Sequence, residues 1–152
     1  MDALEHGNSV EETDEAVLRL GLPMAPSVLL QMVGPRVANH VLETMHEAYP
    51  DRYPLSPTLA NYAEGKDDIV IAEEQPRTVE EITDAVLDAI ADEVRHMLDE
   101  GVVTEAADVD TALILGAGWP FWMGGVTKFL DQTGVSERVA GRPLAEYAAT
   151  PA

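Results

Sequence analysis

The sequence has 152 residues, of which 46% are hydrophobic and 24% are charged, proportions typical of a folded globular chain rather than a disordered one. Twenty-eight Asp and Glu residues against nine Lys and Arg give a net charge of −19, which repels phosphate backbones and argues against nucleic acid or anionic lipid as a partner. No cysteine is present, so disulfides, a thiol nucleophile and a thiolate metal site are excluded.

Prolines, glycines and capping boxes mark helix boundaries along most of the chain. Ser9 with Glu12, and Thr78 with Glu81, form two capping boxes, in which each side chain accepts a hydrogen bond from the backbone of the other residue. No long stretch alternates with period two, so the predicted fold class is all-α. The predicted helices are 10–20, 26–33, 35–49, 59–64, 79–100, 105–116 and 125–133, followed by short helical pieces to the tail, with a polar connector over 65–78.

Two of these helices have an apolar face. Helix 35–49 carries Val37, Val41, Met45 and Ala48 at helical spacing. The stripe on helix 79–100 is longer and consists of Val79, Ile82, Val86, Ile90, Val94 and Met97.

Residues 111–127 carry no charge, so we asked whether they could form a membrane-spanning helix. A spanning helix needs about 20 mostly apolar residues, and this run contains four glycines and Pro120. The sequence therefore predicts a buried helix end and a turn here, with no membrane span. The acidic N-terminal residues 1–16 lack the apolar core of a secretory signal, so a cytoplasmic location is expected.

Three motifs occur twice in the same order, and each second copy lies 94 to 97 residues after the first. The pairs are Leu4-Glu5-His6-Gly7 with Leu98-Asp99-Glu100-Gly101, Asp14-x-Ala16 with Asp110-x-Ala112, and Gly21-Leu22-Pro23-Met24 with Gly118-Trp119-Pro120-Phe121. The sequence therefore predicts a helical bundle of two related units, 1–64 and 79–152, joined by the connector 65–78. A long helix precedes the second copy of the leucine motif but only three residues precede the first, so the first unit is expected to lack its opening helix.

These motifs and their surroundings resemble a known family. The stretches are GLPM at 21–24, VANHVLETMHEAYPDRY at 37–53, DEGV at 99–102 and ADVDTALILGAGWPFWMGG at 107–125. They resemble the C-terminal helical region of 3-hydroxyacyl-CoA dehydrogenases, especially the α-subunit of bacterial multifunctional fatty-acid oxidation enzymes. In that family the helical C-terminal unit occurs twice, which accounts for the repeat.

The resemblance implies a part in fatty-acid β-oxidation, in which the parent enzyme uses NAD to oxidise a 3-hydroxyacyl-CoA. This region would complete the acyl-CoA cleft against an upstream NAD-binding domain and provide a dimer interface. The family's catalytic His–Glu pair and dinucleotide loop belong to that upstream domain, so we expect no catalytic, cofactor or metal residue here and no catalysis by the chain alone. The implied partners are a second copy, the NAD-binding domain, a thiolase subunit and, with the parent enzyme, acyl-CoA.

The candidate interface or cleft residues belong to the two Gly-x-Pro segments: Pro23, Met24, Trp119, Pro120, Phe121, Trp122 and Met123. Asp14 and Asp110, although repeated, are interpreted as structural. The glycines of Gly116-Ala117-Gly118 are interpreted as a helix end, because a dinucleotide fingerprint needs a preceding strand and a third glycine.

Two alternatives from other classes stay open. The first is a free-standing helical interaction module that assembles with separate catalytic chains. The second, weaker, is a di-iron bundle, because Glu43-x-x-His46 and Glu93-x-x-His96 match its ligand motif. On a helical wheel, however, Glu43 and His46 lie away from the apolar face of helix 35–49 and are expected to face water.

Overall fold

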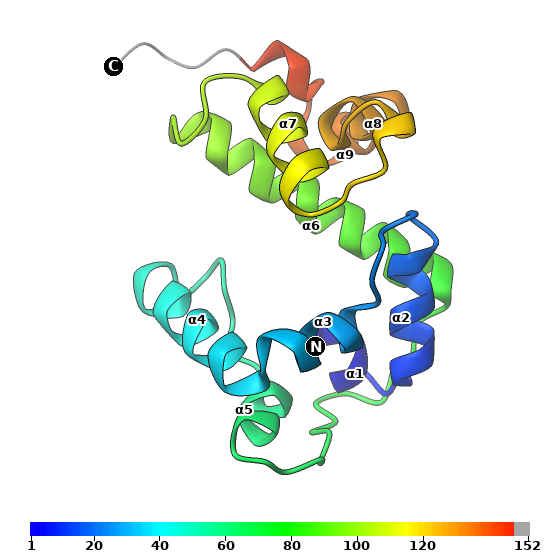
Figure 1. Cartoon of the computed structure of the whole chain (residues 1–152), viewed down its shortest axis with the longest axis vertical. Helices are drawn as coiled ribbons and strands as arrows, with labels where there is room; N and C mark the ends of the chain where they lie inside the picture. The colour runs from blue at the N-terminus through cyan, green and yellow to red at the C-terminus, as the bar shows by residue number, and fades with distance from the viewer. Residues whose placement is uncertain (148–152) are drawn as a thin grey trace. The chain divides into compact units, whose positions relative to one another are not determined.

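The computed structural model describes residues 1–147, whose helices are traced in Figure 1. Every regular element in this range is an α-helix or a 3-10 turn and none is a strand, which confirms the all-α prediction. The chain forms two compact units. Unit 1 comprises residues 1–18 and 24–82, and unit 2 comprises residues 19–23 and the chain from 83 onward. The tail beyond Tyr147, included in the predicted second unit, lies outside the described residues.

Unit 1 is built from short helices whose starts follow the predicted signals. Ser9 and Glu12 form the expected capping box, with hydrogen bonds of 2.9 Å from Ser9 N to Glu12 Oε2 and 3.2 Å from Glu12 N to Ser9 Oγ. Proline occupies the first turn of the next three helices. The elements are α1 (Asp2–Glu5), α2 (Val10–Leu18), α3 (Pro26–Val33), α4 (Pro35–Ala48), α5 (Pro57–Ala63) and the first turn of α6 (Val79–Asp99).

Polar contacts hold much of unit 1 together. The Glu5 carboxylate accepts hydrogen bonds from Ser56 Oγ at 2.6 Å and Thr58 N at 3.1 Å, which ties α1 to the start of α5. The side chain of Asn8 pairs with both backbone groups of Arg77, at 3.0 and 2.7 Å. These bonds satisfy buried polar groups, since Asn8, Ser56 and Thr58 are all buried.

Unit 2 contains the larger hydrophobic core. It comprises the rest of α6 together with α7 (Ala106–Gly116), η1 (Phe121–Met123), α8 (Val126–Gln132), α9 (Val135–Ala140) and η2 (Leu144–Glu146). Helix α8 packs against α7, α9 and η2, and α8 and α9 lie side by side in Figure 1. Its Val126 and Leu130 are fully buried, as is Leu144 of η2.

The buried face of α6 is broader than the predicted stripe. Ile82 and Val94 are buried as the stripe requires, and Val86, Ile90 and Met97 are partly buried against the core of unit 2. The core of unit 2 also includes three α6 residues outside the stripe: Leu87, Ala91 and Leu98. The buried face of α6 therefore includes the predicted stripe and the row of side chains next to it.

The apolar face of α4 differs from the prediction. Val37 and Val41 are about half exposed, at 54% and 49%, while Leu42 and Met45 are the better covered side chains. The expectation that His46 faces water is wrong, because its Nδ1 lies 2.8 Å from the carbonyl oxygen of Tyr53. The chain after α4 turns back along this side of the helix and packs α5 against it, so tertiary contacts decide which face is covered.

Across the described residues 1–147, every helix is too short or too polar to cross a membrane. The uncharged run at 111–127 is divided between the end of α7, a turn, η1 and the start of α8.

The capping boxes predict a specific acid dependence of stability. Hydrogen bonds from Ser9 N and Asn8 lower the pKa of Glu12, and a hydrogen bond from Thr78 N lowers the pKa of Glu81. A lowered pKa stabilises the fold at pH values above the unfolded-state pKa of about 4.3, and this contribution is lost as the pH falls through the folded-state pKa.

We therefore expect Glu12→Gln with Glu81→Gln to lower the melting temperature at pH 6 and to have a smaller effect near pH 3. Thermal unfolding followed by circular dichroism across this range measures the difference. Glu47→Gln, at an exposed position in the last turn of α4, is the matched control for charge removal. A constant offset between the double variant and the native chain at all pH values would contradict the assignment.

Candidate interaction surface

The structure places six of the seven candidate residues in unit 2 and Met24 in unit 1. Met24 is half-buried and Pro23 is exposed. Trp119 and Pro120 are buried, Met123 packs against the core, and Phe121 and Trp122 are exposed. The five candidates at 119–123 therefore separate into inward anchors and outward side chains on one short segment.

The two Gly-x-Pro segments pack reciprocally within unit 2. Gly21 has φ +76°, and a Cβ placed on it would lie 2.9 Å from Cγ of Pro120. Gly118 has φ +72°, and a Cβ there would lie 2.8 Å from Cγ of Pro23. Each glycine thus adopts a left-handed conformation that disfavours other residues and leaves room for the proline of the opposite segment. The sequence supplied both motifs but gave no sign that they touch.

Trp119 anchors the second segment. It is only 4% exposed, and its ring centroid lies 5.8 Å from that of Phe129. Such a tilted aromatic pair stabilises a core beyond its buried area. The indole nitrogen is buried and has no hydrogen-bond partner among the described residues. This anchor fixes the chain just before η1.

Phe121 and Trp122 project outward from η1. They are 72% and 71% exposed, and their rings meet edge to face with centroids 5.3 Å apart. We call these two side chains the aromatic pair. Gly124, in the left-handed conformation at φ +79°, ends η1 and turns the chain into α8. Exposed neighbouring aromatic rings are typical of a contact surface rather than of a core.

Asp110 holds the start of α8 next to this segment. Its carboxylate accepts hydrogen bonds from Thr127 N at 2.7 Å and Thr127 Oγ1 at 2.8 Å. Gly125 lies so close that a Cβ there would be 2.3 Å from Cγ of Asp110. In unit 1, Asp14 accepts the corresponding bonds from Ser27 N at 3.0 Å and Ser27 Oγ at 2.5 Å. Both aspartates therefore act as caps for the helix that follows.

The glycines at 116 and 118 do not fit a dinucleotide loop. Gly116 is the last residue of α7, and Gly118 packs against Pro23. A dinucleotide fingerprint instead joins a strand to a helix N-terminus that faces the pyrophosphate. The described part of the chain thus offers no such cradle at this position.

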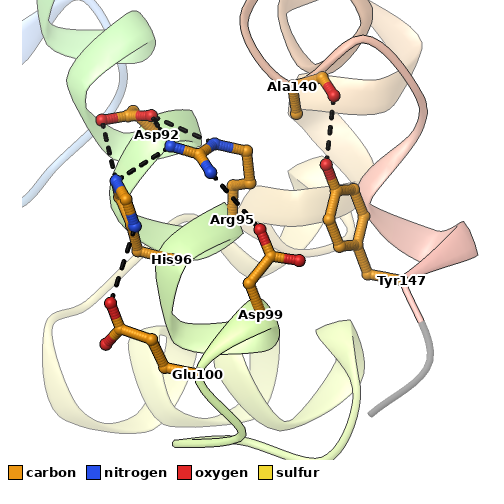
Figure 2. A network of polar contacts seen from close by, with 7 residues as sticks. All are labelled: Asp92, Arg95, His96, Asp99, Glu100, Ala140 and Tyr147. Carbon is orange, nitrogen blue, oxygen red and sulfur yellow. Dashed lines mark hydrogen bonds and ion pairs between the residues drawn. The ribbon is translucent and has the colours of Figure 1, made fainter. Parts of the chain in front are cut away.

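The histidine motifs are engaged in local contacts. Figure 2 shows Arg95 between Asp92 and Asp99, with Arg95 Nη2 2.7 Å from Asp92 Oδ1. This hydrogen bond raises the pKa of Arg95. His96 Nε2 lies 3.7 Å from Asp92 Oδ2, and His96 Nδ1 lies 3.6 Å from Glu100 Oε1, on neighbouring turns of α6.

In the same unit, Tyr147 donates a 3.0 Å hydrogen bond to the Ala140 carbonyl.

The geometry gives the di-iron alternative no support. Among residues 1–147, no group of three or more His, Asp or Glu side chains is arranged to hold a metal ion. Glu43 is exposed, and its Oε1 accepts a 2.8 Å hydrogen bond from Asn39 Nδ2.

Comparison with known proteins agrees with the resemblance carried by the motifs. Residues 1–67 match a family model described as 3-hydroxyacyl-CoA dehydrogenase, C-terminal domain. Over 90% of its length the chain is 26% identical to the fatty acid oxidation complex subunit alpha of Acinetobacter baumannii strain SDF and 28% identical to that of Acinetobacter baylyi. The subunit alpha of Pseudomonas aeruginosa strain LESB58 is 26% identical over the same share.

These matches confirm the predicted resemblance to the C-terminal region of 3-hydroxyacyl-CoA dehydrogenase. The chain covers 24% of the length of each of these relatives, about a quarter.

The reciprocal glycine–proline packing predicts different costs for two alanine substitutions. Gly118 and Gly134 have nearly the same φ, +72° and +77°, but only Gly118 has a neighbour within 4 Å of the added Cβ. Both variants bear the left-handed penalty of about 1–2 kcal/mol, and Gly118→Ala adds an overpacking cost of about 1–3 kcal/mol. Urea unfolding of the two variants measures this difference, and equal free energies of unfolding would contradict the packing.

Proposed function

We propose that the chain acts as the helical C-terminal region of a 3-hydroxyacyl-CoA dehydrogenase in fatty-acid oxidation. It closes the acyl-CoA cleft against an NAD-binding domain supplied by other polypeptide sequence. The observation that supports this proposal best is the match of residues 1–67 to the family model, together with the similarity of 90% of the chain to fatty acid oxidation complex α-subunits. We expect the chain to act in the cytoplasm.

The chain's contribution is binding surface rather than reacting groups. In the parent reaction a hydride leaves C3 of the 3-hydroxyacyl-CoA for NAD, and the hydroxyl proton goes to a base of the NAD-binding domain. The net charge of −19 offers the phosphates of CoA little attraction, so this chain serves the apolar acyl portion of the substrate. Its exposed apolar side chains are suited to walling a cleft.

We further propose that residues 1–64 and 79–152 are two related copies joined by the connector 65–78. The paired motifs support this, as do the two helix-capping aspartates, Asp14 and Asp110. A glycine with positive φ precedes a helix in both segments, at Gly34 before α4 and at Gly134 before α9. The family match to 1–67 ends near the first predicted boundary.

An enzyme assay tests the principal proposal. We expect the pure chain to show no oxidation of NADH with a 3-ketoacyl-CoA, because the hydride-transfer site belongs to the NAD-binding domain. Added to a related fatty acid oxidation α-subunit from which the matching region has been deleted, it should raise the rate at least about tenfold, or about 1.4 kcal/mol in the barrier. Turnover by the chain alone, or no stimulation in the mixture, would overturn the proposal.

The aromatic pair favours a second role as an interaction module. A solvent-exposed Phe–Trp pair on a segment anchored by a buried Trp119 resembles the aromatic centre of a protein interface. We infer that this surface forms a homodimer and, in the complete assembly, contacts a thiolase subunit.

The homodimer is tested by light scattering over a concentration series. Trp122→Asp should weaken the dimer by at least about 2 kcal/mol, the usual scale for a central interface tryptophan. Leu115→Asp is the matched control, because Leu115 is 82% exposed but lies outside the aromatic pair. A monomer mass at every concentration, or equal effects of the two substitutions, would remove this interface.

A further inference from the structure

The chain between α5 and α6 is held against unit 1 by hydrogen bonds although it has no regular element. Residues 66–71 form neither a helix, a turn nor a bend, and Figure 1 traces the chain here as a loop. Three hydrogen bonds fix this stretch: 3.1 Å from Asn61 Nδ2 to Asp68 O, 3.1 Å from Val70 N to Thr58 Oγ1, and 2.8 Å from Ala72 N to Glu5 O. The stretch is thereby tied to both α5 and α1.

All three bonds use even-numbered residues of the stretch, which gives it two different edges. In an extended chain the N–H and C=O groups of one residue point to the same edge, and those of the next residue point to the opposite edge. The backbone groups of Ile69 and Ile71 therefore point away from Thr58 and Glu5. Within residues 1–147 these groups have no hydrogen-bond partner. We call the outward backbone groups of Ile69 and Ile71 the connector edge.

The side chains beside the connector edge suit pairing with a strand. Val70 is 36% exposed and Ile71 is 49% exposed, while Ile69 is half-buried. Branched aliphatic residues such as these favour a pleated, partly covered surface. An unpaired backbone edge with apolar side chains is a template for another strand. Because three hydrogen bonds already order this stretch, less conformational entropy is lost when a partner binds.

We propose that the connector edge binds the edge strand of a β-sheet in another protein, and that Lys or Arg residues flank the paired stretch of this strand. The partner supplies the sheet, because the described residues 1–147 contain no strand and a stable sheet needs about three. Such strand addition is a recurring mode of recognition. The inference goes beyond the proposed function and concerns unit 1, whereas the aromatic pair belongs to unit 2.

The charges on both sides of the connector edge select this partner. Four exposed carboxylates flank it: Asp67, Asp68, Glu73 and Glu74. The neighbouring Lys66 is paired with Glu64, with Nζ 2.5 Å from Oε2. Two copies paired along this edge would bring carboxylates together in either strand direction, and like charges on paired strands are destabilising. A strand with basic flanks is instead attracted, and its association rate is raised.

The test uses a fluorescein-labelled β-hairpin peptide, titrated onto the full chain at about 150 mM salt and followed by fluorescence anisotropy. The two peptide strands alternate Val and Thr, are joined by Asn-Gly and end in Lys, so the connector edge adds the third strand. We expect saturable binding. A hairpin of the same charge whose outward amides are N-methylated controls for simple charge attraction and should bind at least about tenfold more weakly. Equal binding of the two hairpins would overturn the proposal.

Two substitutions at one position separate backbone pairing from side-chain contact. Ile71→Pro removes an N–H of the connector edge and should weaken binding at least about tenfold. Ile71→Ala is the matched control, because it shortens the side chain but keeps the N–H, and it should weaken binding less. Residue 71 lies outside every helix, so circular dichroism should show unchanged helix content in both variants. Equal weakening by the two substitutions contradicts strand addition.

Amide hydrogen exchange followed by NMR tests the native chain without a substitution. The free amides of Ile69 and Ile71 should exchange faster than the bonded amides of Val70 and Ala72, and the hairpin should slow them. No saturable binding, or binding without slower exchange at Ile69 and Ile71, overturns the proposal. Slower exchange at higher chain concentration without the hairpin assigns the edge to a second copy and also overturns it. The enzyme assay does not depend on these residues, so the two proposals fail separately.

Discussion

The reciprocal packing of Gly21 on Pro120 and of Gly118 on Pro23 is the constraint on which the arrangement of unit 2 depends. It admits only glycine at two positions, because each requires both a left-handed backbone and the absence of a Cβ. It also brings residues 19–23 into the compact unit formed mainly by the chain from residue 83 onward. The buried Trp119 lies between the two contacting residues Gly118 and Pro120, and the outward aromatic pair comes immediately after Pro120 in the sequence. The short segment 118–123 thus contributes Trp119 to the core of unit 2 and exposes the aromatic pair at its surface.

The two units reach stability by different means. Unit 2 has an extended apolar core in which Leu130 and Leu144 are fully buried, so the hydrophobic effect dominates there. Unit 1 has few buried apolar residues, and none at all on α3 or α4. Its helices are tied instead by buried polar contacts such as those of Asn8 and Glu5. A unit with a small core and exposed aliphatic side chains is suited to gaining further stability from a partner.

The family resemblance and the local geometry bear on different questions. The match of residues 1–67 to a C-terminal domain model and the coverage of about a quarter of the relatives' length concern what this chain is similar to. The geometry concerns a surface that the chain offers, which is the aromatic pair in unit 2.

The sequence by itself placed the ends of the predicted helices within about two residues, although it did not include α1, because proline, glycine and capping signals act over a few residues. The box of Ser9 and Glu12 and the proline starts of α3 and α4 lie where the pattern predicted them. The paired motifs also identified the family resemblance and drew attention to Trp119 and Trp122. Tertiary structure alone decided which of these tryptophans is buried, since that depends on the contact of each Gly-x-Pro segment with the other. It also decided the covered face of α4, where His46 meets Tyr53, because burial is set by the neighbour that packs on a helix and not by the helix's own periodicity.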